Sequence, residues 1–208
     1  MQGVRVGIVI YEEVEVLDFC GPFEVFSVVR LNEEKRREES SPLQPLLIAE
    51  SSGPVTATGG MQVLPHYSMA DCPHLDILVV PGGWGFRHHM QNASLHGWLR
   101  ERAAKAETVT AVCTGSLLLS AAGLLDGLDA TTHWRFLDSM RDTFPAVNVK
   151  YEKHFVRDGR VFTSAGISAG IDMSLKVVEH RFGEKVARAT ARHMEYPYPD
   201  ADARRIQL

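Results

Sequence analysis

The chain has 208 residues, of which 45% are hydrophobic and 23% are charged, and its formal net charge is −4. This length and composition suit one globular domain with a full core, and the negative balance gives no electrostatic footprint for nucleic acid. No apolar run is long enough to cross a bilayer, and acidic residues follow the first apolar run at once. We therefore expect a cytoplasmic protein that has no signal peptide, no membrane partner and no nucleic-acid partner.

The first half of the chain predicts strands that alternate with helices. Continuous apolar runs such as 4–10 are typical of strands buried on both faces of a sheet. Pro22 suits the first position of a helix, and Phe23 and Phe26 recur at helical spacing. The expected elements are a strand at 4–10, a helix at 21–32, a charged surface loop at 32–41, a strand at 45–50, short strands or a hairpin at 54–65, a strand that runs into a glycine-rich turn at 75–85 and a helix at 92–106.

The second half continues the alternation. The dipeptide Asp158-Gly159 lies between alternating apolar residues, which predicts a hairpin. The expected elements are a strand at 108–112, a helix at 114–125, a short strand and a helix within 129–144, the hairpin at 149–164, a long helix at 167–183, further helix at 184–196 and an aperiodic tail. We predict a single α/β domain over 1–208, with its core at about 4–195, built as a three-layer sandwich around a mostly parallel sheet.

The cysteines and histidines indicate neither a disulfide framework nor a metal site. Three cysteines stand at wide spacing, at Cys20, Cys72 and Cys113. The nine histidines form no HExxH motif, and none of them pairs with a CxxC motif. We therefore expect no metal and no cofactor.

Cys113 stands where the strand at 108–112 turns into a helix. Its neighbours are small (Ala111, Thr114, Gly115 and Ser116), as a sharp strand-to-helix corner requires, and the pattern is similar to a nucleophile elbow. Such a corner would expose the sulfur at the carboxyl edge of the sheet. The free amides of the helix N-terminus would lower the pKa of the thiol. A packed core thiol is the alternative.

Two further segments converge on this edge of a parallel sheet. The amides of Gly82 and Gly83 could form an oxyanion hole with the amide of Thr114, although a glycine pair also simply makes a tight turn. Asp18 follows the first strand and could cap a helix. Beside a thiolate it would instead share a proton with the sulfur and act as a general acid.

Taken together, five segments resemble the ThiJ/PfpI superfamily, a branch of the class I glutamine amidotransferase-like fold. They are "VLDFCGPFEVF", "VVPGGWG", "AVCTG", "ATTHW" and "TSAGISAGIDMSL". The resemblance runs from about residue 4 to residue 195 and is strongest to the isonitrile hydratase branch. It implies a flavodoxin-like sheet, a small-molecule substrate and a homodimer.

Carried over residue by residue, the resemblance makes Cys113 the nucleophile, Asp18 its acidic partner and Thr114 the threonine that follows it in the hydratases. Gly83 and the Thr114 amide match the oxyanion pocket. His133 matches a histidine near the nucleophile, and its alternative is a helix-start histidine that is bonded to the backbone. Protease-like members carry histidine at the position of Thr114, so that local Cys-His dyad is absent here.

The activity implied is hydration of an isonitrile to an N-substituted formamide through a thioimidate on Cys113. One alternative is cysteine-dependent chemistry on a carbonyl or an amide, as in glyoxalase- or amidase-like relatives. Another is a sensing domain for a ligand or an oxidant, with Cys20 as a resolving thiol. Regulators that share the domain add a DNA-binding module, and the residues after Tyr196 are too few for one.

Overall fold

The computed structural model of the chain describes residues 3–206, and its core is a seven-stranded sheet. The strands are β1 (Val4–Val9), β2 (Leu43–Ala49), β5 (Tyr67–Ser68), β6 (Ile77–Val80), β7 (Thr108–Val112), β10 (Phe155–Asp158) and β11 (Val161–Ser164). Their order is β10-β11-β7-β6-β1-β2-β5, and every pair is parallel except the β10–β11 hairpin. The predicted mostly parallel sheet and the hairpin at Asp158-Gly159 are confirmed.

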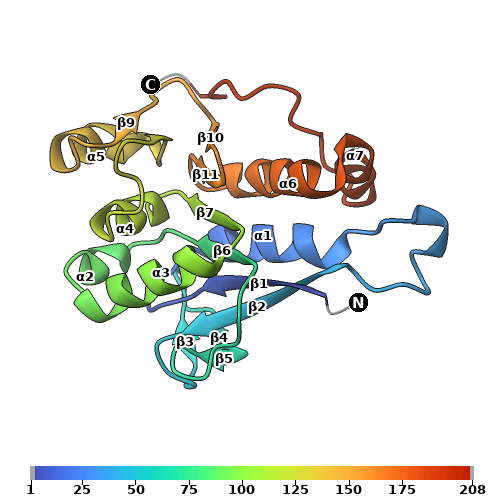
Figure 1. Cartoon of the computed structure of the whole chain (residues 1–208), viewed down its shortest axis with the longest axis horizontal. Helices are drawn as coiled ribbons and strands as arrows, with labels where there is room; N and C mark the ends of the chain where they lie inside the picture. The colour runs from blue at the N-terminus through green and yellow to red at the C-terminus, as the bar shows by residue number, and fades with distance from the viewer. Residues whose placement is uncertain (1–2, 207–208) are drawn as a thin grey trace.

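Helices cover both faces of this sheet (Figure 1). One layer holds α1 (Val16–Val28), α6 (Ala169–Phe182) and α7 (Glu184–His193), and the other holds α2 (Phe86–His89), α3 (Ala93–Lys105) and α4 (Gly115–Ala121). The apolar strands are buried between the two layers, as their sequences require. The predicted three-layer α/β sandwich is therefore confirmed.

Short elements complete the chain at the edges of the sheet. They are β3 (Val55–Thr56) and β4 (Gln62–Val63), β8 (Asp129–Ala130) and β9 (Asn148–Val149), α5 (Leu137–Thr143), and the 3-10 turns η1 (Glu33–Lys35) and η2 (Trp134–Phe136). The antiparallel pair β3–β4 confirms the hairpin expected at 54–65. Over residues 3–206, none of the helices is both long and apolar enough to cross a membrane.

The first helix begins five residues earlier than the sequence predicts. The expected start was Gly21, but α1 begins at Val16, and Pro22 lies inside it. The chain before α1 is held against the glycine turn, because the amide of Glu15 donates to the carbonyl of Gly82 at 2.9 Å. Since proline has no amide proton, the carbonyl of Asp18 loses its helical donor at Pro22. The early start places Asp18 in the first turn of the helix.

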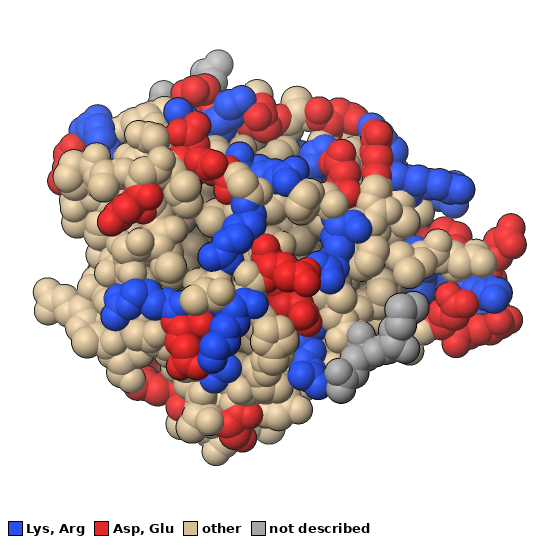
Figure 2. All heavy atoms as spheres, in the orientation of Figure 1, with Lys and Arg blue, Asp and Glu red and all other residues tan. Residues whose placement is uncertain are grey.

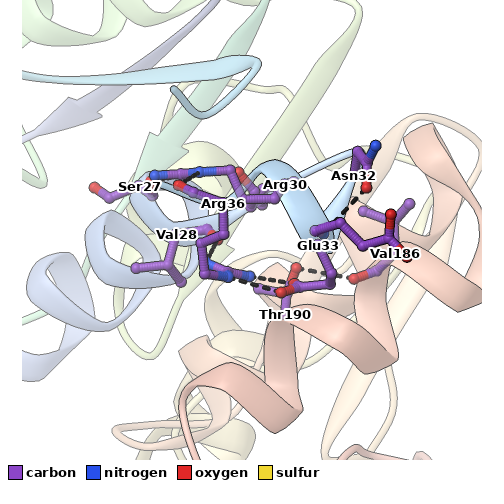
Figure 3. A network of polar contacts seen from close by, with 10 residues as sticks. Ser27, Val28, Arg30, Asn32, Glu33, Arg36, Val186 and Thr190 are labelled. Atoms are coloured by element: carbon purple, nitrogen blue, oxygen red, sulfur yellow. Dashed lines mark hydrogen bonds and ion pairs between the residues drawn. The ribbon is translucent and has the colours of Figure 1, made fainter. Parts of the chain in front are cut away.

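The charged segment at 32–41 is mostly exposed, as expected of a surface loop, but its Arg36 also caps the end of α1 together with Arg30. Arg36 Nη1 donates to the carbonyl of Val28 at 2.7 Å, and Arg30 Nη1 donates to those of Ser27 and Val29 at 3.1 and 2.7 Å. Arg36 also donates to Glu33 through Nε at 2.8 Å. Figure 3 shows this network beside Thr190 of α7. The two arginines thus satisfy carbonyls that a helix end leaves without donors.

Charges of both signs are interspersed over the face shown in Figure 2, which has the orientation of Figure 1. Blue and red side chains lie beside each other across the centre of this face. Ion pairs on the protein include Lys153–Asp202 and Lys176–Glu179. Exposed pairs of this kind contribute little to stability.

Replacing Arg36 should destabilise the fold, because its guanidinium holds the end of α1. We expect Arg36→Met to lower the free energy of unfolding by about 1–2 kcal/mol in urea denaturation, as for lost charge-assisted hydrogen bonds. The neighbouring Arg37→Met is the matched control, because Arg37 is exposed. Equal effects of the two substitutions would show that the capping contacts contribute nothing.

Candidate active site

Cys113 occupies a sharp corner between β7 and α4. Its φ of 56° lies in the left-handed region that side chains rarely adopt, as the elbow prediction requires. The carbonyl of Cys113 accepts hydrogen bonds from Ser116 Oγ at 2.9 Å and Thr132 Oγ1 at 2.8 Å. Gly115 is needed for the turn, since a Cβ there would lie 2.0 Å from the carbonyl oxygen of Val80. These contacts hold the strained backbone in one conformation.

Asp18 is fully buried in the first turn of α1, next to the thiol. The amide of Gly82 donates to its Oδ2 at 3.0 Å, whereas Oδ1 has no hydrogen-bond partner among residues 3–206. Burial, followed by the charge of Glu15, raises the pKa of Asp18 to about 8 and outweighs the opposing effect of the Gly82 amide. The carboxyl group is therefore mainly protonated at neutral pH and has a free oxygen.

The thiol of Cys113 also keeps its proton. Burial first, and then the neighbouring Asp18, raise its pKa well above the ordinary value, although the amide of Thr114 acts in the opposite direction. The expectation of a lowered thiol pKa was therefore wrong for the free protein. The reason is that α4 has only seven residues and its first turn is buried, so desolvation outweighs the helix amides.

The glycine turn after β6 holds the acid and the threonine together. The Gly83 amide donates to Thr114 Oγ1 at 3.1 Å, and the Gly82 amide is engaged by Asp18. A Cβ at Gly82 would lie 2.6 Å from the Thr114 amide nitrogen and 2.9 Å from Asp18 Oδ2. The two glycine amides are therefore not a free oxyanion pair, which corrects the role predicted for them. Gly82 lets Asp18 and Thr114 approach each other, and Gly83 lets the backbone of Glu13–Glu15 pack against the turn.

His133 lies on the other side of the thiol. Its Nδ1 accepts a hydrogen bond from the amide of Arg135 at 3.3 Å, which is the backbone bond expected of a helix-start histidine. Its ring nevertheless borders the cavity at Cys113. Burial, followed by the charges of Arg135 and Arg204, lowers the pKa of His133. The ring is therefore neutral at physiological pH.

Gly166 makes room for both side chains, a role that the sequence did not indicate. A Cβ at this position would lie 2.6 Å from Cys113 Sγ and 2.7 Å from His133 Cδ2. Gly166 follows β11 within the segment "TSAGIS". A glycine inside a resembling motif was the available signal, but only the structure shows what the missing side chain avoids.

The C-terminal tail, expected to be aperiodic, is tied to the same region. It crosses from α7 toward β9 and β10 (Figure 1). Arg204 Nη2 donates to Thr131 Oγ1 at 2.9 Å and to the carbonyl of Thr132 at 3.2 Å. Because Thr132 in turn holds the carbonyl of Cys113, the tail supports the corner through two hydrogen-bonded steps.

A cavity of about 250 Å³ opens onto the thiol. Its walls are mainly aromatic and apolar, and charge comes from Glu15 and Arg135. The lining residues are Glu15, Gly83, Trp84, Phe86, Cys113, Thr114, His133, Trp134, Arg135, Phe136 and Ile167. The sequence reasoning missed most of the aromatic ones, although Trp84 and Trp134 directly follow the glycine turn and His133.

Other ionisable clusters do not assemble around this cavity. Among the residues that the structure describes, no group of three or more His, Cys, Asp or Glu side chains could hold a metal ion. Cys20, Cys72 and Cys113 are free thiols, and Cys20 is half-buried in α1.

Comparisons with known proteins show which family and which relatives the chain resembles. The sequence profile of the DJ-1/PfpI family matches residues 4–180. The chain is 37% identical to an isonitrile hydratase of Pseudomonas putida over 201 residues, which is 96% of this chain and 82% of that protein. It is also 33% identical over 142 residues to the HTH-type transcriptional regulator GbdR of Pseudomonas aeruginosa. The match covers 68% of this chain and 38% of the regulator.

Solved structures show the same fold. A ThiJ/PfpI family protein from Pseudomonas syringae superposes with a TM-score of 0.82 at 30% identity, over 97% of this chain and 78% of that one. DJ-1beta of Drosophila melanogaster superposes with a TM-score of 0.77 at 22% identity, over 95% of this chain and all of that one. The second similarity concerns the fold alone.

The raised pKa of Asp18 predicts a stability that falls as the pH rises. Between about pH 4 and pH 8 the unfolded chain releases this proton while the folded protein retains it, so each pH unit costs up to about 1.4 kcal/mol. Asp18→Asn removes this titration. We therefore expect its stability relative to wild type in urea denaturation to increase from pH 4.5 to pH 8.

A carboxylate with the opposite shift provides the control. The pKa of Asp71 is lowered, first by the hydrogen bond from Ser68. Its contribution is therefore present in full above its unfolded pKa of about 4 and is lost only below it, so the difference in stability between Asp71→Asn and wild type should stay constant from pH 4.5 to pH 8. A difference between Asp18→Asn and wild type that does not change with pH would contradict a protonated, buried Asp18.

Adding one methyl group at Gly166 should obstruct the thiol. We expect Gly166→Ala to slow alkylation of Cys113 by iodoacetamide, followed by peptide mass spectrometry, and to destabilise the fold by about 1–3 kcal/mol. Gly97→Ala is the matched control, because a Cβ there meets no atom within 4 Å. It should leave alkylation unchanged and stabilise α3 by up to about 1 kcal/mol. Unchanged alkylation in Gly166→Ala would rule out the close approach.

Proposed function

The chain belongs to the DJ-1/PfpI family, and we propose that it is a cysteine-dependent enzyme that hydrates an isonitrile to an N-substituted formamide. The observation that carries the proposal is the buried pair of Cys113 and Asp18, in which both groups are protonated and Asp18 Oδ1 is free. The 37% identity with an isonitrile hydratase supports the same activity. The residue after the nucleophile is Thr114, so the local Cys-His dyad of protease-like relatives is absent.

A doubly protonated pair suits the first half of this reaction. The terminal carbon of an isonitrile accepts a proton and a nucleophile at the same atom. Asp18 gives its carboxyl proton to that carbon, Cys113 Sγ bonds to it, and the thiol proton returns to Asp18. The product is a thioimidate, in which sulfur, hydrogen and the imine nitrogen share one carbon. Asp18 serves as acid and base in turn, so no free thiolate has to form in the buried site.

Hydration of the thioimidate completes the cycle. Water adds across the carbon–nitrogen double bond, with its oxygen on carbon and a proton on nitrogen. Asp18 relays this proton, and Thr114, which accepts a hydrogen bond from the Gly83 amide, orients the water. The carbon–sulfur bond then breaks, the new hydroxyl becomes the formyl carbonyl, and its proton returns to sulfur. One isonitrile and one water give one formamide, and both catalytic groups regain their protons.

A ligand-sensing domain is the second candidate. It is favoured by the 33% identity to a transcriptional regulator, and the match covers 38% of that regulator's length. In that case the cavity would bind a small molecule without turnover. Carbonyl chemistry on Cys113 is a weaker alternative. The homodimer that the resemblance implies is a separate prediction, which sedimentation would test.

The decisive test is formamide production from an alkyl isonitrile, followed by mass spectrometry. We expect turnover by the wild type, its loss in Cys113→Ala, and a decrease of about 10²–10⁴-fold in Asp18→Asn. Because the acid must hold its proton, kcat/KM should fall as the pH rises through about 8. Cys72→Ser is the control, because that thiol lies outside the cavity lining. A folded wild type without turnover, or activity that persists in Cys113→Ala, would exclude the hydratase, and methylglyoxal turnover would then test the carbonyl alternative.

A further inference from the structure

Four aromatic side chains line the cavity that opens onto Cys113. Phe86 is buried, Phe136 is half-buried, and Trp84 and Trp134 stand at the mouth with exposed fractions of 50% and 44%. Large apolar side chains that remain this exposed beside a cavity generally mark a binding surface. The four rings come from two segments, the glycine turn with α2 and the turn η2.

The rings are held in place before any ligand arrives. Phe86 and Phe136 form an edge-to-face pair, with centroids 5.2 Å apart and planes at 82°. The guanidinium of Arg87 lies 4.5 Å from the centre of the Trp84 ring and 5.6 Å from that of Phe136. Arg135 covers Trp134 at 4.9 Å. Preorganised rings lose little freedom on binding, so this arrangement favours a ligand of matching shape.

The size of the cavity fits a ring together with its reactive group. An apolar cavity of about 150 Å³ accommodates benzene, so about 250 Å³ leaves room for an aromatic ring and an isonitrile that reaches the sulfur. The charges exclude ionic substituents. Glu15 already raises the pKa values of Asp18 and Cys113, so a second anion beside the sulfur is disfavoured. Arg87 and Arg135 disfavour a cation at the mouth.

We propose, building on the hydratase function above, that the substrate is an isonitrile whose nitrogen carries an uncharged aryl or arylmethyl group. The ring lies against Trp84, Phe86, Trp134 and Phe136, and the terminal carbon of the isonitrile points at Cys113 Sγ. Ring–ring contacts add to the burial of apolar area, and they require a flat ring with a polarised face.

Benzyl isonitrile and cyclohexylmethyl isonitrile separate this proposal from simple hydrophobic binding. The two compounds share one carbon skeleton, but the saturated ring is thicker and more apolar. A cavity that binds only by burying apolar surface should therefore prefer the cyclohexylmethyl compound. We expect the wild type to favour the benzyl compound in kcat/KM by roughly 3- to 10-fold, as stacking interactions of ordinary strength give. Trp84→Leu and Trp134→Leu should each move this ratio toward one.

Trp98→Leu is the matched control. Trp98 lies on α3, where its Nε1 donates to the carbonyl of Met69, and it does not line the cavity. The ratio of the two substrates should therefore stay at the wild-type value in this variant, even if the protein is less stable, because both rates come from the same sample.

Each other outcome has a definite meaning. Turnover of both compounds without a preference for benzyl would overturn the aromatic substrate and leave the hydratase standing. If the folded protein turns over neither isonitrile, the proposed hydratase function is overturned, and the proposed substrate class is overturned with it. If Trp84→Leu and Trp134→Leu change the sedimentation of the protein but not the substrate ratio, the tryptophans cover a second copy of the chain, and the aromatic substrate is again overturned.

Discussion

The burial of one carboxyl group beside one thiol is the constraint on which the rest of the site depends. Asp18 has no exposed surface and Cys113 has almost none, so burial raises the pKa of both groups, and the charge of Asp18 raises the pKa of Cys113 further. Such a pair survives folding only if it keeps its protons and its backbone is held firmly. The amide of Gly82, the hydroxyl groups of Ser116 and Thr132 and the arginine of the tail provide that hold.

The glycines of the site act through the side chains they lack. Gly82 lets Asp18 and Thr114 meet, Gly115 lets the helix start against β6, and Gly166 leaves space for the sulfur and the imidazole. The strained corner at Cys113 therefore depends on close approaches that only these glycines permit. Protonated groups, a fixed corner and aromatic walls together favour addition of a neutral molecule over hydrolysis that begins from a free thiolate. This combination connects the protonation of the buried pair with the proposed chemistry.

Much of the fold was predictable, because periodicity and turn residues are local signals. The parallel strands, both hairpins and α3 follow from runs of fewer than twenty residues. The start of α1 was not predictable, because the contact between Glu15 and Gly82 joins segments that are far apart in the sequence. The segment at 32–41 is the exposed loop that the sequence predicts, but its capping contact was not predictable, for a similar reason. Its Arg36 finds an acceptor in the carbonyl of Val28 at the end of α1, which the sequence of the loop does not show.

The sequence alone determined the sheet, the corner at Cys113 and the three segments that meet there, since strand ends and small residues are visible in the chain itself. The tertiary structure decided the state of the site. Whether a helix end lowers the pKa of a thiol depends on how much water reaches it, and burial reversed that prediction. It also decided that the glycine amides are occupied, that Gly166 is needed for space, and that two tryptophans frame the cavity. Desolvation and steric fit arise between segments that are distant in the chain, so no local pattern encodes them.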